Sequence, residues 1–113
     1  MIRVSVTLDG AGALRACRVR GHAGLGPRGA DLVCFAVSVL VRTVLRTLSG
    51  RPGIDVRGGA PNRGLLWMEA DYKAEGRDFL AAAGAFLVEG LRSVSEKYPD
   101  CCCITIEPIP EHD

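Results

Sequence analysis

The apolar residues of this chain recur with two different periods, and the order in which these periods alternate limits the available folds. From Ile2 to Leu8 apolar and polar residues alternate, which predicts a strand with one buried face. Residues 9–12 include two glycines that tolerate the positive φ of a reverse turn, so a second strand over residues 14–20 is expected to complete a hairpin. Later elements must then cover one face of this hairpin.

Two amphipathic helices are expected to provide that cover. Residues 31–48 repeat apolar side chains at spacings of three and four, with Asp31 predicted as the N-cap. A second helix is expected over residues 75–98. Its predicted apolar stripe consists of Phe79, Leu80, Ala83, Phe86, Leu87, Leu91 and Val94. Gly84 and Gly90 lie inside this helix, where each costs about 1 kcal/mol relative to alanine, so we expect close packing at both positions.

Three further strands complete the predicted order of elements. Residues 54–57 and 65–72 predict two strands joined by a loop over residues 58–64, which is too long for a tight turn, and residues 101–107 predict the last strand. The order ββαββαβ indicates an α+β fold, a two-layer sandwich with two helices on one face of a largely antiparallel sheet. The length of 113 residues suits one domain, which we assign to residues 1–108, followed by a short tail at 109–113.

Composition and charge argue against several classes of function. Fourteen basic and thirteen acidic residues give a formal charge of +1, too little for a nucleic-acid binder held by its overall field. The most apolar stretch, residues 32–48, contains Ser38, Arg42 and Arg46 and is too short to span a membrane. The alternating N-terminus is not typical of a secretory signal, and five cysteines make an odd number, so we expect reduced thiols in the cytoplasm.

His22 and Cys34 lie at the two ends of a glycine-rich segment that is expected to form a mobile loop. The other histidine, His112, lies in the tail. Cys34 falls in the first turn of the predicted helix, where unpaired backbone amides and the helix dipole stabilise negative charge. A thiolate is the nucleophilic form of cysteine, and an imidazole can accept the thiol proton and later donate it to a leaving amine. The pair is therefore a candidate for a nucleophile and its general base.

Simpler interpretations of the same residues stay open. A cysteine in an apolar helix is most often a small core residue, and His22 can equally cap the hairpin. The consecutive cysteines at 101–103 point to alternate faces of a strand and lack the spacing of a zinc site, so no metal is expected. Six arginines are expected to form a solvated surface, with contact to ribosomal RNA as the alternative. They are Arg15, Arg18, Arg20, Arg42, Arg46 and Arg51.

The stretch GHAGLGPRGADLVCFAVS, residues 21–38, resembles the Prp family of bacterial ribosomal-processing cysteine proteases. The hallmark of that family is a Gly-His-Ala segment, a glycine loop and an Asp-Ile-Val-Cys segment with a following serine. The chain length, the early hairpin and both helices also resemble the family. Leu32 replaces the usual isoleucine, and Phe35 stands where a small alanine is common, so Phe35 is expected to narrow the space beside the thiol.

The resemblance implies a homodimeric cysteine endopeptidase that removes the N-terminal extension of a large-subunit ribosomal protein during ribosome assembly, without a cofactor. It further implies that Cys34 is the nucleophile and His22 the catalytic histidine, with Asp31 and Ser38 as supporting residues. The mobile loop of the site would include Gly21, Ala23, Gly24, Gly26 and Gly29. The implied partners are the ribosomal protein precursor, a second copy of the chain and the ribosome; no membrane is involved.

The supporting residues each have two interpretations. Asp31 either caps the helix or orients His22, and capping is favoured because Asp31 precedes Cys34 by three residues. Ser38 lies one helical turn beyond Cys34 on the same face, so it is either a hydrogen-bond partner or a small residue that permits close packing. Backbone amides at the start of the helix are candidate donors to an oxyanion.

The same residues are also compatible with two rival functions. The first is a non-catalytic, ribosome-associated binding module in which Cys34 is buried and His22 is structural. The second is a thiol redox or acyl-transfer enzyme that uses the same two residues on small molecules, and a resolving cysteine near Cys34 would favour redox chemistry.

Overall fold

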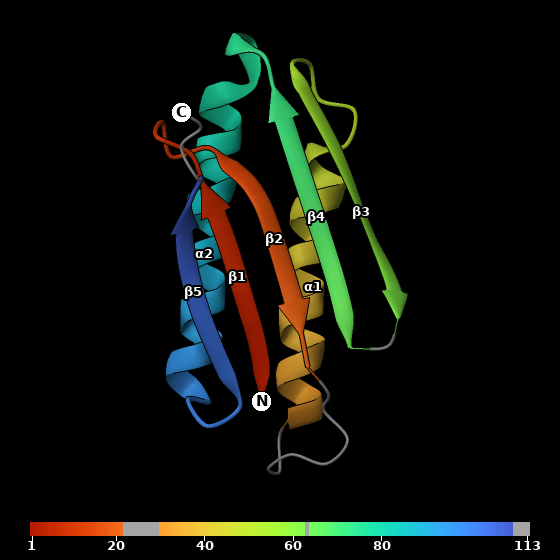
Figure 1. Cartoon of the computed structure of the whole chain (residues 1–113), viewed down its shortest axis with the longest axis vertical. Helices are drawn as coiled ribbons and strands as arrows, with labels where there is room; N and C mark the ends of the chain where they lie inside the picture. Colours follow the sequence, from red (N-terminus) through yellow and green to blue (C-terminus); the bar gives the residue numbers. More distant parts are fainter. Residues whose placement is uncertain (22–29, 63, 110–113) are drawn as a thin grey trace.

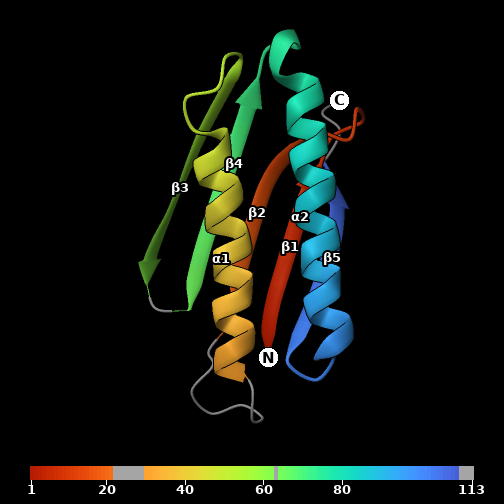
Figure 2. The same cartoon turned by 180° about the vertical axis from the view of Figure 1, so that it is seen from behind.

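The computed structural model describes residues 1–21, 30–62 and 64–109, which form a five-stranded sheet and two helices. The strands are β1 (Ile2–Leu8), β2 (Leu14–Arg20), β3 (Ile54–Asn62), β4 (Leu65–Tyr72) and β5 (Cys102–Pro108). The helices are α1 (Ala30–Leu48) and α2 (Arg77–Lys97), and a 3₁₀ turn at Ala74–Gly76 precedes α2. Both helices cover the same face of the sheet (Figures 1 and 2). The predicted two-layer α+β sandwich and the order ββαββαβ are therefore confirmed.

The strands lie in the order β3-β4-β2-β1-β5. Three neighbouring pairs are antiparallel, and the β1–β5 pair is parallel, which confirms the largely antiparallel sheet. Each helix connects two strands that run in the same direction, α1 between β2 and β3 and α2 between β4 and β5 (Figure 1). A crossover helix is needed because parallel strands cannot be joined by a tight turn.

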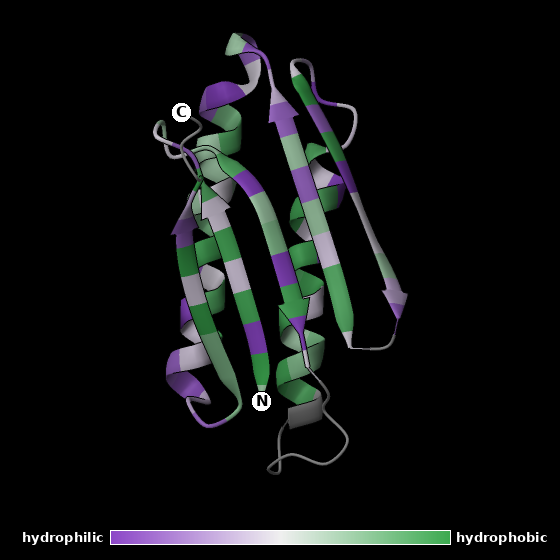
Figure 3. Cartoon of the chain, in the orientation of Figure 1, coloured by the Kyte–Doolittle hydropathy of each residue, from purple (hydrophilic) through white to green (hydrophobic). Residues whose placement is uncertain are grey.

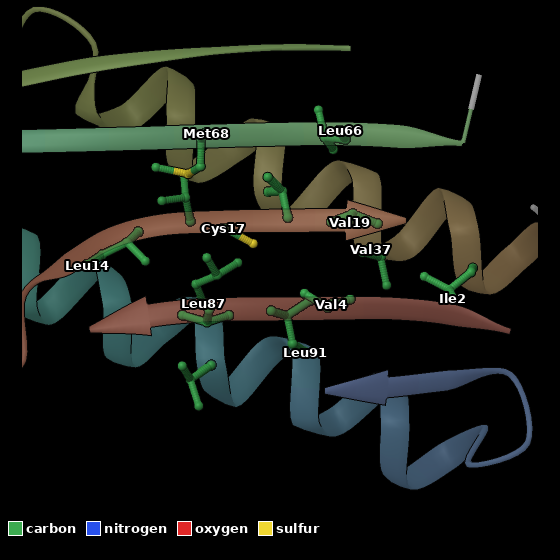
Figure 4. Close-up of a cluster of buried hydrophobic side chains, with 14 of the residues drawn as sticks. Ile2, Val4, Leu14, Cys17, Val19, Val37, Leu66, Met68, Leu87 and Leu91 are labelled. Carbon is green, nitrogen blue, oxygen red and sulfur yellow. The ribbon is translucent and has the colours of Figure 1, made fainter. Parts of the chain in front are cut away.

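The core lies between the two layers. Inward side chains of the strands meet one face of each helix, so the strands alternate between hydrophobic and hydrophilic residues (Figure 3). Figure 4 shows ten of the buried residues by label: Ile2, Val4, Leu14, Cys17, Val19, Val37, Leu66, Met68, Leu87 and Leu91. The expected close packing at the two helix glycines is confirmed. A Cβ on Gly84 would lie 3.2 Å from Leu14 Cβ, and one on Gly90 would lie 2.9 Å from Leu40 Cδ2.

The predicted loop between the third and fourth strands is wrong, because residues 58–62 extend β3 and leave a short connection to β4. Gly58 suits this strand because its neighbours are close: a Cβ would lie 2.7 Å from the Trp67 carbonyl oxygen and 3.0 Å from Leu45 Cδ2. Pro61 is tolerated because β3 is an edge strand and pairs only with β4. This longer strand brings the β3–β4 connection beside the start of α1.

Local predictions on the helices and the last strand also need correction. Helix α1 begins at Ala30, so Asp31 is its second residue and not its N-cap; alanine is a strong helix former and extends the helix by one residue. Phe86 is 62% exposed because the buried face of α2 includes Val88 instead. Cys101 and Cys102 are both buried, although the cysteines at 101–103 are expected to point to alternate faces of a strand, because Cys101 precedes β5 and does not follow its alternation.

Candidate active site

A cavity of about 290 Å³ lies where α1 meets the ends of β2, β3 and β4. Helix α1 contributes Cys34, Ser38 and Arg42 to its wall. These residues are four positions apart, and side chains at this spacing lie on one face of a helix. Cys34 and Ser38 therefore share a face, as the sequence predicts.

The remaining walls come from the sheet. Ile2 and Val19, on β1 and β2, are buried core residues that provide an apolar floor. The end of β3 and the start of β4 provide the opposite wall through residues 60–62 and 64–66. Residues 60–62 are exposed, as is the α1 residue Arg42, so the cavity opens to solvent along this side.

Gly21 fixes how the chain leaves β2 at the edge of this cavity. Its φ of +134° is one that L side chains rarely adopt, and its N–H donates a hydrogen bond to the Gly64 carbonyl oxygen at 3.0 Å. A Cβ at this position would collide with the Met1 carbonyl oxygen. The end of β2 is thereby tied to the β3–β4 connection, and both lie at the end of the molecule where α1 begins (Figures 1 and 2).

Several predicted site residues lie outside the described part of the chain. They are His22, Ala23, Gly24, Gly26 and Gly29. Asp31 is placed by its backbone, as the second residue of α1, while its side chain belongs to the same undescribed group. Of the predicted site, the structure therefore brings Gly21, Cys34 and Ser38 to one cavity, and it leaves the position of His22 as a prediction.

Cys34 differs from the other four cysteines in its surroundings. It is half-buried: it packs against the core and lines the cavity. Cys17, Cys101 and Cys102 are buried, and burial raises the pKa of the Cys17 thiol to about 12, which keeps it protonated and unreactive. Cys103 is exposed and does not line this cavity. A purely structural role requires that Cys34 be buried, and the structure shows it only half-buried.

The position of Cys34 in the helix differs slightly from the prediction. Because α1 begins at Ala30, Cys34 is its fifth residue and stands just past the first turn. The backbone amides of residues 30–32, at the described start of α1, precede the thiol and remain the candidate oxyanion donors.

The positions of Phe35 and Arg42 relative to the cavity differ from those that the sequence predicts. Phe35 is 68% exposed and is not among the residues that line the cavity, so it does not narrow the space beside the thiol. Successive helical residues point about 100° apart, which turns Phe35 away from the face of Cys34. Arg42 was expected on a general solvated surface but borders the cavity. Its spacing of eight residues from Cys34 is the sequence signal that would have identified it.

Other features of the described residues do not compete with this site. A larger cavity, of about 360 Å³, borders β3, β4 and the 3₁₀ turn, but the residues that line it include no cysteine or histidine. Over residues 1–21, 30–62 and 64–109, no group of three or more His, Cys, Asp or Glu side chains is arranged to hold a metal ion. No described helix is long and apolar enough to cross a membrane.

Comparison with known proteins points to one family. The family model described as "Cysteine protease Prp" matches residues 1–103. No curated protein sequence matches the chain. Among solved structures, the essential ribosomal processing protease Prp from S. aureus, in complex with a substrate peptide, superposes with a TM-score of 0.79 at 18% identity, covering 95% of this chain and 100% of that one. SMU.848 from Streptococcus mutans gives 0.76 at 22% identity, covering 96% and 95%.

Proposed function

This chain belongs to the cysteine protease Prp family, and from that membership we propose that Cys34 is its nucleophile and His22 its general base and acid. One observation supports this assignment above the others: Cys34 is half-buried in the wall of a cavity that is open to solvent. His22 follows directly on Gly21, which lines the same cavity. Their sequence context, Gly-His-Ala and Asp-Leu-Val-Cys, resembles the hallmark segments of the family.

The proposed reaction is a two-step acyl transfer. His22 accepts the thiol proton of Cys34, and the thiolate attacks the carbonyl carbon of the scissile peptide bond, forming a C–S bond. The C–N bond then breaks as His22 donates the proton to the leaving amine, which leaves a thioester. Water, deprotonated by His22, attacks the thioester, releases the carboxylic acid and returns the thiol. Backbone amides in the first turn of α1 are the proposed donors to the oxyanion.

Asp31 and Ser38 are proposed as supporting residues. Ser38 lines the cavity one helical turn beyond Cys34, where its hydroxyl is available to a bound peptide or to the catalytic pair. Asp31 lies in the first turn of α1, where a carboxylate is stabilised by the helix dipole. Orientation of His22 is the role we propose for Asp31, and its place inside α1 supports that role over N-capping.

We propose that the substrate is the N-terminal extension of a large-subunit ribosomal protein. The similar S. aureus enzyme is a ribosomal processing protease that has been crystallised with a substrate peptide. The test is incubation of the purified protein with a ribosomal precursor that carries such an extension, followed by intact mass spectrometry. We expect one defined N-terminal fragment with the wild type and none with Cys34→Ser. An unchanged precursor in both reactions would contradict the proposed function.

Thiol alkylation distinguishes the protease from a binding module without any substrate. In a Cys103→Ser background, which removes the exposed thiol, we expect iodoacetamide at pH 6 to modify Cys34 at least about tenfold faster than a free cysteine, because His22 maintains the thiolate. His22→Ala should abolish this advantage. Peptide mapping identifies the modified residue, and the buried Cys17 provides the unreactive internal control. A rate no faster than that of a free thiol would favour the binding module.

We also propose that the protein forms a homodimer and associates with the ribosome. The dimer proposal is supported by exposed apolar side chains on the outer surface of α1. Leu32 is 57% exposed, Phe35 68% and Val39 44%, and a second copy of the chain would cover them.

The proposed contact with the ribosome is supported by the uncovered face of the sheet. There Arg3 on β1 lies opposite Arg20 on β2, and both are exposed, which suits contact with phosphates. Sedimentation of the protein alone and with ribosomes tests both proposals.

A further inference from the structure

The wall of the Cys34 cavity carries one permanent charge among its described residues. Most of the wall is apolar or backbone, and Ser38 and Asn62 add neutral polar groups. Arg42 is the exception. A guanidinium remains protonated at any physiological pH and offers five N–H donors in a planar fork that matches a carboxylate.

Arg42 is not engaged by the described part of the chain. Ion pairs among residues 1–21, 30–62 and 64–109 involve Arg15, Arg57, Arg77 and Arg92. The hydrogen bonds found over the same ranges do not include the Arg42 side chain. No described residue therefore occupies the donors of Arg42. Ile2 and Val19 give the same cavity an apolar wall, while Arg42 is exposed at its open side.

The spacing along α1 sets how far this charge lies from the reacting sulfur. Arg42 is eight residues after Cys34, which corresponds to a rise of about 12 Å along the helix axis. Helical side chains in general lean toward the helix N-terminus, which from Arg42 is the direction of Cys34. An extended peptide advances about 3.3 Å per residue. When the carbonyl carbon of the scissile bond lies at the Cys34 sulfur, a substrate side chain about three residues away would therefore reach Arg42.

We propose that Arg42 is a specificity-determining residue that binds the carboxylate of an Asp or Glu side chain about three residues from the scissile bond of the substrate. This inference rests on the proposed function, because it takes Cys34 as the nucleophile. Arg42 contacts a part of the peptide that does not react, so it stabilises the bound substrate and the transition state equally. Its removal is then expected to raise KM and to leave kcat unchanged.

Peptides that differ only in one charge test this inference. They are acetylated and amidated, contain the cleavage site found in the precursor, and carry Glu or Gln at two, three or four residues on either side of the scissile bond. We expect the wild type to cleave one Glu peptide about tenfold more efficiently than its Gln counterpart, through a lower KM. Arg42→Gln should remove this preference. Arg46→Gln, an exposed arginine one turn further along α1 and outside the cavity wall, is the matched control and should keep it.

A charge-reversal variant distinguishes a loss of specificity from a loss of folding. Arg42→Glu should prefer Lys to Glu at the same peptide position, a gain that damage to the fold cannot produce. Equal cleavage of all peptides by the wild type, or an unchanged preference in Arg42→Gln, would overturn the role of Arg42 and leave the protease assignment intact. Failure of the wild type to cleave either the precursor or any peptide would overturn both.

Discussion

Replacement of Cys34 by alanine is expected to lower kcat/KM for peptide cleavage by a factor of at least about 10⁴, because removal of a nucleophile eliminates the covalent pathway and leaves only binding and oxyanion stabilisation. No other described cysteine lines the cavity, so none can replace it. The measurement is the initial rate of product formation by liquid chromatography at several substrate concentrations. Substrate binding, followed by fluorescence anisotropy of a labelled peptide, should change little.

The matched control for this variant is Cys103→Ser. Cys103 is exposed on β5, outside the cavity wall, so its replacement should leave kcat/KM within about twofold of the wild type. Circular dichroism and urea denaturation of both variants should give midpoints close to that of the wild type, since neither removes a large core side chain. A Cys34→Ala variant that retains a tenth or more of wild-type activity would show that the nucleophile lies elsewhere.

Replacement of Gly21 by alanine is expected to reduce the free energy of unfolding by about 3 kcal/mol and to remove most of the activity. The φ of +134° is strained for any L residue, and the added Cβ would collide with the Met1 carbonyl oxygen and lie 3.0 Å from Ile2 Cα. Backbone cannot move aside as a flexible side chain can. Because Gly21 directly precedes His22, the resulting shift of the backbone should lower kcat/KM by at least about tenfold.

Gly12 provides the control that separates backbone strain from collision. Its φ is +80°, but a Cβ there would meet no heavy atom within 4 Å. Gly12→Ala should therefore cost about 1 kcal/mol, the penalty of the left-handed conformation alone, and leave activity unchanged. Urea denaturation curves of the two variants give the comparison. Equal losses of stability in both variants would show that the contact with Met1 has no energetic effect.

Much of the fold is determined by local patterns in the sequence. The alternation in Ile2–Leu8 and the spacing in α1 each depend on which face of one element is buried, and this information is carried by neighbouring residues. The glycines inside α2 likewise predict close packing, and the structure places Leu14 beside Gly84 and Leu40 beside Gly90. The prediction was wrong at Phe86, because a helical stripe with apolar residues at its margin does not specify where the buried face ends.

The extent of β3 and the composition of the site were decided by contacts between distant parts of the chain. A run of glycines and a proline is typical of a loop, but here the backbone of β4 and the side chain of Leu45 hold it as an edge strand. The Gly-His-Ala and Asp-Leu-Val-Cys segments identify Cys34 and His22 as candidates from the sequence by itself. The sequence does not indicate that Gly21 meets Gly64, or that Arg42 borders the same cavity as Cys34. Periodicity specifies which side of a helix faces inward, whereas only the packed sheet specifies what that side meets.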